Sequence, residues 1–457
     1  MKITVHNLGV IKKAEIDLKP LTILVGPNNA GKTWLAYTLA GILGLDGLNQ
    51  YMSAYIEERV VKAFSPLENA IEQILNEGNA TIDLQAFANQ YGEIYFNNVA
   101  LFAKQWMYSY FNTDSVSFAD LEISLNLAEE KQRFLERVLE TSLRNEVSVG
   151  QRRQGALLSF LKKEGERTLL IYTSADKLVE EKLPREIIRE RLINSVFRLL
   201  HQALYPDTRI FPTERAGLVI FPSMSQLLTF LGYGTFIRPI TLFIFLMNAI
   251  FGISPLKRKQ REEQAQNHSE IRTYIQLAEL LEKHVMGGAI DFKPESEPGR
   301  EILFKPDESS SLGISITSSM IKELTPLVLY LRYLAMPDEL LIIDEPEMNL
   351  HPEAQAKLIE FLAMLVNAGL NVLVTTHSPY IIDHLTNLIK AAEHEDKAAI
   401  SGQFFLKKQD AFISKDKVSV YLVENGQAIN AIDENGVIDL STFGTVSDRI
   451  SDIYFSL

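Results

Sequence analysis

Apolar and polar residues alternate over residues 3–5 and again over 16–18, which predicts two half-buried strands at the start of the chain. A continuous apolar run over residues 21–25 then stops at a glycine and a proline, as expected of a buried strand that enters a turn. Apolar residues return at helical spacing over residues 35–42. The beginning of the chain therefore predicts strands, a loop and a helix, in that order.

The middle of the chain is mainly helical in character. Over residues 50–205, segments such as 121–144 and 180–204 combine dense charge with apolar residues at helical spacing. These segments are too short and irregular for a long coiled coil, which needs several uninterrupted heptads. A strand-like stretch, RTLLIY at residues 167–172, interrupts the helices.

Strand patterns return in the C-terminal part. Residues 208–222 predict a strand and a turn, and a second mainly helical stretch follows them. After a loop rich in proline and glycine (294–299), residues 301–304 and 312–316 predict a hairpin. From Thr317 onward helices and strands alternate, which is typical of a parallel sheet with crossover helices.

Composition narrows the class of protein. The chain has 457 residues, 46% of them apolar, enough for a large core and for two or three structural units. Its net charge of −13 does not attract nucleic acid as a whole, although basic runs at 257–261 and 152–153 leave local binding open. There are no cysteines, which excludes disulfides, thiolate metal sites and a Cys-x-x-Cys zinc hook and fits a reducing cytoplasm.

The most apolar run, Ile240–Ile253, has the length of a buried helix rather than of a membrane span. Arg238 and Pro239 precede this run, and Asn248 interrupts it. We therefore expect a helix of the core or of a subunit contact. The N-terminus has no apolar signal segment, so we expect a cytoplasmic protein without membrane association.

The strongest motif satisfies Gly-x-x-x-x-Gly-Lys-Ser/Thr between a predicted buried strand and a helix, and comprises Gly26, Pro27, Asn28, Asn29, Ala30, Gly31, Lys32 and Thr33. The glycines let backbone N–H groups surround a phosphate at a helix N-terminus, where the helix dipole favours an anion. Lys32 is expected to reach the β and γ phosphates of ATP, and the Thr33 hydroxyl to bind Mg²⁺. The alternative is a glycine-rich turn without a ligand, which the flanking strand and helix disfavour.

Two further predicted strands end in side chains that could bind a metal ion or transfer a proton. The run LLII leads to Asp344 and Glu345, and we expect Asp344 to hold Mg²⁺ and Glu345 to orient or deprotonate the attacking water. A third strand ends at His377, whose imidazole could hydrogen-bond the γ-phosphate or the water. Each motif taken alone could instead be a strand that ends in a polar turn. The loop 347–351 and the amphipathic helix 352–368 follow the carboxylate pair, and this loop is well placed to touch a second subunit.

Taken together, GPNNAGKT, SSMIKEL, LLIIDEPEMNLHPEAQ and VTTHSP resemble the ABC-type ATPase domains of the OLD (overcoming lysogenisation defect) nucleases and their relatives in bacterial anti-phage systems. They are more distantly similar to the Rad50, SMC and RecF ATPases. The segment FPTERAGL also resembles a piece common in the defence branch. The resemblance implies a head-to-head homodimer, or a higher homo-oligomer, that encloses ATP and Mg²⁺.

In that class the signature motif of one subunit completes the ATP site of the other. The resemblance places this role on Ser319, which would bind the partner's γ-phosphate. The family usually has glycine after this serine, whereas this chain has Met320, whose side chain could crowd the approach to phosphate. No convincing glutamine loop is found, since Gln151, Gln154 and Gln202 are all poor candidates. No aromatic residue precedes Gly26 to stack on adenine, and residues 6–13 are the remaining candidates.

We therefore predict an α/β fold with an ABC-type P-loop ATPase core assembled from both chain ends and large, mainly helical insertions. The predicted segments are core at 1–48, insertion at 49–207, core strand and turn at 208–222, insertion at 223–299, and core at 300–457. OLD nucleases carry a Toprim nuclease domain after the ATPase, and the stretch after His377 is too short for both lobe completion and such a domain. We expect no built-in nuclease.

Two functions remain open. In the first, the chain resembles the ATPase subunit of PARIS-type systems, a sensor ATPase that controls a separate effector, either a toxin or a nuclease. In the second, it is a DNA-binding repair or maintenance ATPase of the RecF or Rad50 type. The acidity of the chain and the lack of a long coiled coil count against the second.

Overall fold

The computed structural model describes residues 1–61, 64–147, 158–173, 184–220, 237–292, 301–307, 310–433, 435–438 and 453. The chain forms two compact units. Unit 1 comprises Met1–Thr4, Gly41–Trp106 and Ala119–Asp207, and unit 2 comprises Val5–Ala40, Met107–Phe118 and Thr208–Leu457. The predicted division into five segments stays a prediction.

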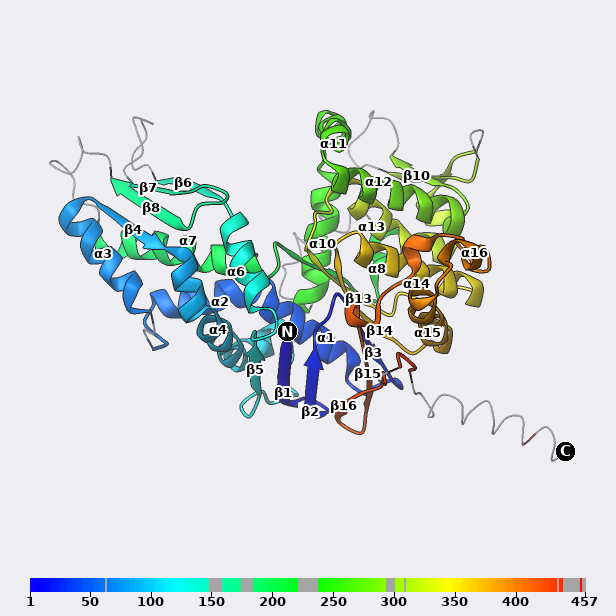
Figure 1. Cartoon of the computed structure of the whole chain (residues 1–457), viewed down its shortest axis with the longest axis horizontal. Helices are drawn as coiled ribbons and strands as arrows, with labels where there is room; N and C mark the ends of the chain where they lie inside the picture. The colour runs from blue at the N-terminus through cyan, green and yellow to red at the C-terminus, as the bar shows by residue number, and fades with distance from the viewer. Residues whose placement is uncertain are drawn as a thin grey trace. The chain divides into compact units, whose positions relative to one another are not determined.

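Unit 2 is built on a twisted sheet whose strands come from both ends of the chain (Figure 1). The strand order from β1 runs β1-β2-β16-β15-β3-β14-β13-β9. These strands are β1 (Lys2–Leu8), β2 (Ile11–Asp17), β3 (Leu21–Val25), β9 (Thr208–Phe211), β13 (Leu340–Asp344), β14 (Asn371–Thr376), β15 (Val418–Glu424) and β16 (Gln427–Asn430). The predicted α/β core from both chain ends is thus confirmed.

The five strands from β15 to β9 are parallel, so their carboxyl ends meet at one edge. Strand β3 is buried at every position, because β14 pairs with it on one side and β15 on the other. Its end, Val25, pairs with Thr376, and Asp344 at the end of β13 pairs with Thr375. This register brings the ends of three predicted strands together, and in open parallel sheets ligands bind beyond that edge.

Helices cover this sheet, and α14 packs on β14 as the amphipathic pattern predicts. A small antiparallel sheet (β10, Ala289–Phe292; β11, Ile302–Lys305; β12, Leu312–Gly313) confirms the predicted hairpin. The helices of unit 2 are α5 (Met107–Tyr110), α8 (Arg215–Ile220), α10 (Arg238–Phe251), α11 (Pro255–Asn267), α12 (Ser269–Leu281), η3 (Glu282–Met286), η4 (Ile314–Ile316), α13 (Ser319–Tyr333), α14 (Pro352–Asn367), α15 (Pro379–Glu393), α16 (Lys397–Ser401), η5 (Gln409–Ala411) and η6 (Lys415–Lys417), with α1 (Lys32–Leu43) reaching into unit 1.

The apolar run 240–253 forms α10, and most of that helix is buried. Phe243 and Ile250 are fully buried, and Phe243 packs edge-on against Phe211 of β9. Phe245 is 41% exposed, so one side of the helix keeps an accessible ring. The core interpretation is therefore correct. No single helix among the described residues has the length and apolarity of a membrane span, and one bent pair, α10 with α11, reaches them only jointly.

Unit 1 joins helices to a four-stranded antiparallel sheet of order β4-β8-β7-β6. The predicted strand at 167–172 is present as β8, whereas the other three strands were not predicted. Aromatic rings fill its helical core, with Phe197 against Tyr51, Tyr55, Phe64 and Tyr95. The elements are α2 (Leu45–Ile56), α3 (Ser65–Glu77), β4 (Asn79–Asp83), α4 (Leu84–Phe102), η1 (Ala103–Gln105), β5 (Glu122–Asn126), α6 (Lys131–Glu140), β6 (Leu143–Val147), β7 (Leu158–Lys162), β8 (Thr168–Thr173) and α7 (Arg185–Leu204).

Candidate active site

The loop between β3 and α1 has the conformation that its glycines require. Gly26 has φ +153° and Gly31 has φ +101°, both in the region that favours glycine. A Cβ atom at Gly26 would lie 2.2 Å from the carbonyl oxygen of Val423, and one at Gly31 would lie 2.7 Å from the Ile11 side chain. The neighbouring strands therefore exclude a side chain at both positions, which keeps the loop backbone tight at the N-terminus of α1.

Lys32 is the first residue of α1, and only 4% of it is exposed. Its Nζ donates hydrogen bonds to the carbonyl oxygens of Gly26 and Pro27, both at 2.9 Å. Burial lowers the pKa of Lys32, and the nearby carboxylates of Glu345 and Asp344 oppose that shift. A buried ammonium held by loop carbonyls fits a phosphate anion, which would provide the compensating charge.

Asp344 is fully buried and accepts hydrogen bonds from hydroxyl groups of several elements. The Thr33 hydroxyl lies 3.0 Å from Oδ1, and the hydroxyls of Thr213 and Tyr37 lie 2.8 and 3.1 Å from Oδ2. The Thr375 hydroxyl also donates to Oδ1. The structure thus brings together the predicted magnesium ligands Thr33 and Asp344, and hydroxyl and carboxylate oxygens suit this hard cation, with phosphate and water completing its shell.

Glu345 and His377 face each other at the same sheet edge. Nδ1 of His377 lies 3.5 Å from Oε1 of Glu345 and 3.4 Å from Oε1 of Glu347. Glu345 adopts φ +46°, a conformation that non-glycine residues rarely take, and its amide donates to the carbonyl and hydroxyl oxygens of Thr375. Its side chain is 20% exposed and that of His377 is 42% exposed, so both side chains can reach a ligand.

Glu347 is a buried member of the loop that we expect to touch a second subunit. In this loop, 347–351, Leu350 is buried as well, and residues such as Asn349 and His351 are exposed. Glu347 Oε1 accepts from the Thr376 hydroxyl (2.6 Å) and the His377 amide (2.9 Å). Its Oε2 is buried without a hydrogen-bond partner among the described residues. Glu347 therefore fixes the end of β14 from which His377 projects.

Arg215 was not predicted as a site residue. It begins α8 and is 2% exposed. Its guanidinium donates to the carbonyl oxygens of Asp344 (2.7 Å) and Glu345 (3.0 Å), and its Nε lies 3.0 Å from Oε2 of Glu323 on α13. The Asn349 amide donates to the other oxygen of Glu323 at 3.0 Å. Arg215 thus joins the backbone of both site carboxylates to α13, and the motif FPTERAGL marked its location without indicating this role.

Burial acts on both partners of this ion pair. It lowers the pKa of Arg215 and raises the pKa of Glu323, and the attraction between the two charges opposes each shift. The guanidinium stays charged, because arginine is not deprotonated in proteins. Removing the Glu323 charge would therefore leave a buried cation without its ion-pair partner.

The predicted signature lies at the beginning of α13. Ser318 caps this helix by accepting from the Ile321 amide at 3.4 Å, and Ser319 is exposed in the first turn. Met320 is partly buried and packs against the core. The concern that its side chain crowds a phosphate is thus reduced, because the side chain is engaged in the core.

The candidates for the glutamine loop and for the adenine contact lie in different parts of the structure. Gln202 lies on α7 of unit 1, while Gln151 and Gln154 lie outside the described residues. The side chain of Thr213, two residues after the end of β9, donates to Asp344. Within residues 6–13, Ile11 and Val10 lie against Gly31, and Val10 is 55% exposed. This strand connection therefore borders the phosphate loop.

Two protein families match the chain. Residues 1–196 match a family described as an AAA ATPase domain, and residues 318–383 match one described as an AAA domain, putative AbiEii toxin, Type IV TA system. The first match contains the phosphate loop, and the second contains Ser319, the Asp344–Glu345 pair and His377. The assembled site and these matches support an ATP-binding ATPase.

Several solved structures of SMC heads are similar at low identity. An Smc head bound to the C-terminal winged-helix domain of ScpA shares 13% identity over 94% of this chain and 96% of that chain, with a TM-score of 0.39. The Pyrococcus furiosus Smc head with an extended coiled coil, bound to the C-terminal domain of ScpA, shares 11% over 98% of each chain, with a TM-score of 0.35. The SMC head domain from Thermotoga maritima shares 10% over 95% and 98%, with a TM-score of 0.31. The comparison with curated proteins gave no match.

Proposed function

We propose that the chain hydrolyses ATP with Mg²⁺ in a dimer closed around the nucleotide, and that this cycle controls a separate effector protein in anti-phage defence. The observation that carries the ATPase part is the convergence of Lys32, Asp344, Glu345 and His377 at one sheet edge. These residues come from three strand ends that the parallel register places side by side. The family matches support the same activity.

Each residue has a role that follows from its chemistry. Lys32 neutralises the β and γ phosphates, while Thr33 and Asp344 hold Mg²⁺, which supplies charge neutralisation when bound. Glu345 accepts a proton from the attacking water or orients this water. His377 hydrogen-bonds the same water or the γ-phosphate. Glu347 holds the backbone of His377 in position, and Arg215 holds the backbone of Asp344.

The dimer is proposed from the state of Ser319. This side chain is exposed at the N-terminus of a 15-residue helix, where the helix dipole favours an anion, and it makes no side-chain hydrogen bond among the described residues. A γ-phosphate held by a second copy of the chain fits this position. The role of the first helical turn is then to complete the neighbour's site.

The regulatory role rests on the two resemblances. The sequence resembles OLD-type ATPases of defence systems, and the family matched by residues 318–383 is named for a putative toxin of a toxin–antitoxin system. Both point to a role in bacterial conflict rather than in transport. The partner would be a toxin or nuclease supplied in trans.

The alternative, a DNA-binding repair ATPase, loses part of its support. Of the basic run on α11, Arg258 lies 4.1 Å from the ring centre of Phe292, and Arg261 is buried and donates to the Ala335 carbonyl. Two of its cations thus stabilise the fold, and Lys257 and Lys259 remain exposed. The pair at 152–153 lies outside the described residues.

A mixing experiment tests the composite site. Lys32→Ala should abolish ATP binding, and Ser319→Arg should bind ATP without completing its neighbour's site. In a mixed dimer, one site combines the intact phosphate loop of the Ser319→Arg subunit with the intact Ser319 of its neighbour. We expect partial recovery of ATP hydrolysis in the mixture, with neither variant active alone. Absence of recovery in mixed dimers verified by native mass spectrometry would contradict the composite site.

A further inference from the structure

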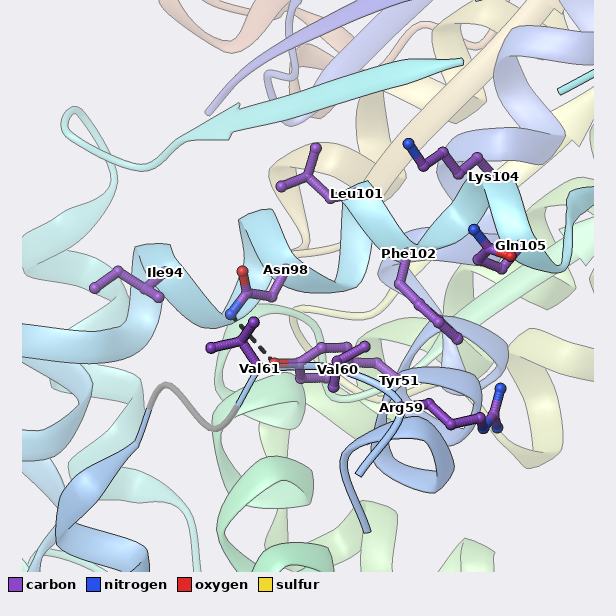
Figure 2. Close-up of a pocket in the computed structure, with 10 residues that line it drawn as sticks. All are labelled: Tyr51, Arg59, Val60, Val61, Ile94, Asn98, Leu101, Phe102, Lys104 and Gln105. Atoms are coloured by element: carbon purple, nitrogen blue, oxygen red, sulfur yellow. Dashed lines mark hydrogen bonds between the residues drawn. The ribbon is translucent and has the colours of Figure 1, made fainter. Parts of the chain in front are cut away.

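Unit 1 contains a pocket with a volume of about 580 Å³, within the range of small-molecule sites (Figure 2). None of its residues belongs to the candidate active site. It is lined by Tyr51, Arg59, Val60, Val61, Ile94, Asn98, Leu101, Phe102, Lys104 and Gln105. One wall is α4 and its continuation η1, and the other is the segment that follows α2.

One end of this pocket is apolar and unusually exposed. Ile94 and Leu101 lie on one face of α4, at i and i+7, and are 44% and 52% exposed. Val61 on the opposite wall is 83% exposed. Single exposed aliphatic side chains are common, but several around one concavity mark a binding surface.

The floor of the pocket carries a polar group. Tyr51 is 1% exposed, and its hydroxyl accepts a hydrogen bond from the Asn98 amide at 3.2 Å (Figure 2). No acceptor for the Tyr51 hydroxyl proton is present among the described residues. Burial raises the pKa of Tyr51, so the hydroxyl keeps its proton and can donate it.

The other end of the pocket is cationic. Figure 2 shows Lys104, Gln105 and Arg59 at the end away from Ile94, with Phe102 between the two cations. The Arg59 guanidinium lies 5.8 Å from the ring centre of Phe102, and its Nε pairs with Glu57 at 2.7 Å, which leaves its terminal nitrogens for a ligand. Lys104 has no partner among the described residues, and no acidic side chain lines the pocket.

We propose that this pocket binds a small amphipathic anion, that is, an organic molecule with an aryl or alkyl body and one carboxylate, sulfonate or phosphate group. The body lies between Val61, Leu101 and Ile94. The anionic group lies at the end that carries Lys104 and Arg59, where it accepts a hydrogen bond from one of these cations. The mixed lining carries the proposal, because exposed aliphatic side chains (Ile94, Leu101, Val61) and the donors of Lys104 and Arg59 surround one cavity and so offer an apolar surface together with partners for an anion.

Binding is tested with two probes, 1-anilinonaphthalene-8-sulfonate by fluorescence and decanoate by calorimetry, on the full chain. We expect saturable binding at one site and competition between the probes. Lys104→Glu and Leu101→Asp should each weaken binding about 10-fold or more, since charge-assisted contacts and apolar burial each contribute on that scale. Lys131→Glu, an exposed change of equal charge on α6, should leave affinity unchanged.

The melting temperature of each variant shows whether it folds, and decanol in place of decanoate tests the cationic end. Decanol binding as tightly as decanoate would overturn the proposal, and so would probe binding that the pocket variants leave intact. Absence of saturable binding, combined with loss of a co-purifying protein from Leu101→Asp, would assign the surface to a protein partner instead.

Discussion

Asp344 accepts hydrogen bonds from four hydroxyl groups among the described residues, those of Thr33, Tyr37, Thr213 and Thr375. This arrangement commits the carboxylate to one orientation before any ligand binds. Glu345, one residue further on, is held through its backbone by Thr375 and Arg215, and its side chain faces His377 and is 20% exposed, so it can meet water. The different settings of these adjacent carboxylates are consistent with the roles proposed for them, metal binding for Asp344 and catalysis for Glu345.

Glu345→Gln should bind ATP but hydrolyse it about 10²–10⁴-fold more slowly, because the amide cannot accept the proton of the attacking water. Nearly the same side-chain shape should preserve the fold and stabilise the ATP-bound dimer. The measurement is single-turnover hydrolysis alongside nucleotide binding and sedimentation. Turnover at the wild-type rate would place the base elsewhere.

Site residues that lie in contiguous sequence motifs could be predicted. Residues whose role depends on partners distant in the sequence could not. The phosphate loop, Asp344 and His377 follow buried apolar runs, so their position at the sheet edge could be predicted. Arg215 could not, because a single arginine after a strand usually faces solvent, and its partner Glu323 lies far along the chain. The burial of Glu347 was not predicted either, since a loop carboxylate is usually exposed, and the subunit contact expected of the loop 347–351 stays a prediction.

At the scale of elements, α8 and α13 are connected to the site by the Arg215–Glu323 ion pair. Glu323→Gln should destabilise the fold by about 3 kcal/mol, because the buried Arg215 loses its ion-pair partner. It should also reduce kcat with a smaller effect on KM for ATP, because Arg215 holds the carbonyl oxygens of Asp344 and Glu345. Turnover is measured well below the unfolding midpoint.

Glu282→Gln is the matched control. Glu282 is buried and paired with Arg332 in the same unit, and its hydrogen bonds involve Ile290 rather than the site. It should lower stability comparably and leave kcat unchanged. An equal loss of kcat in both variants would mean that Glu323 acts only on stability.

His201 on α7 makes the stability of unit 1 depend on pH. Its ring contacts the Tyr95 hydroxyl and the carbonyl oxygens of Leu43 and Gly44, and burial lowers the pKa of His201 from 6.5 to about 4. The folded protein therefore excludes a proton that the unfolded chain accepts below pH 6.5. This stabilising contribution is complete above that pH and is lost as pH falls towards 4, by up to about 3 kcal/mol.

His201→Gln removes this titration while keeping a donor and an acceptor. We expect the free energy of unfolding, measured by denaturant titration, to fall less steeply between pH 7 and 4.5 in the variant than in wild type. Parallel pH profiles would show that the buried ring does not control this dependence.

The elements of unit 1 show why its sheet escaped prediction. β4 is short and alternates between exposed and buried positions, which the surrounding helical charge pattern obscures. β8 was recognised because four apolar or aromatic residues follow one another in it. Short edge strands that depend on neighbours distant in sequence carry a weak local signal.

At the scale of the whole molecule, the proposal separates ATP chemistry from effector chemistry. The purified chain should hydrolyse ATP and should not cleave plasmid DNA or RNA in the presence of Mg²⁺, because the proposal assigns Asp344 and Glu345 to the nucleotide. Activity on nucleic acid should appear only with a partner. Cleavage by the isolated chain that survives Glu345→Gln would contradict the separate-effector proposal.

The central position of β3 also has a consequence for biosynthesis. This strand is translated early, yet both of its neighbours, β14 and β15, come from the far end of the chain, and Thr22 and Ser419 bond across 397 positions. The phosphate loop therefore cannot acquire its native support while the ribosome is still making the middle of the protein. Contacts of such sequence separation form slowly and leave strand edges open in the meantime. Nascent chains stalled before residue 371 should accordingly need a chaperone, and would emerge without a formed nucleotide site.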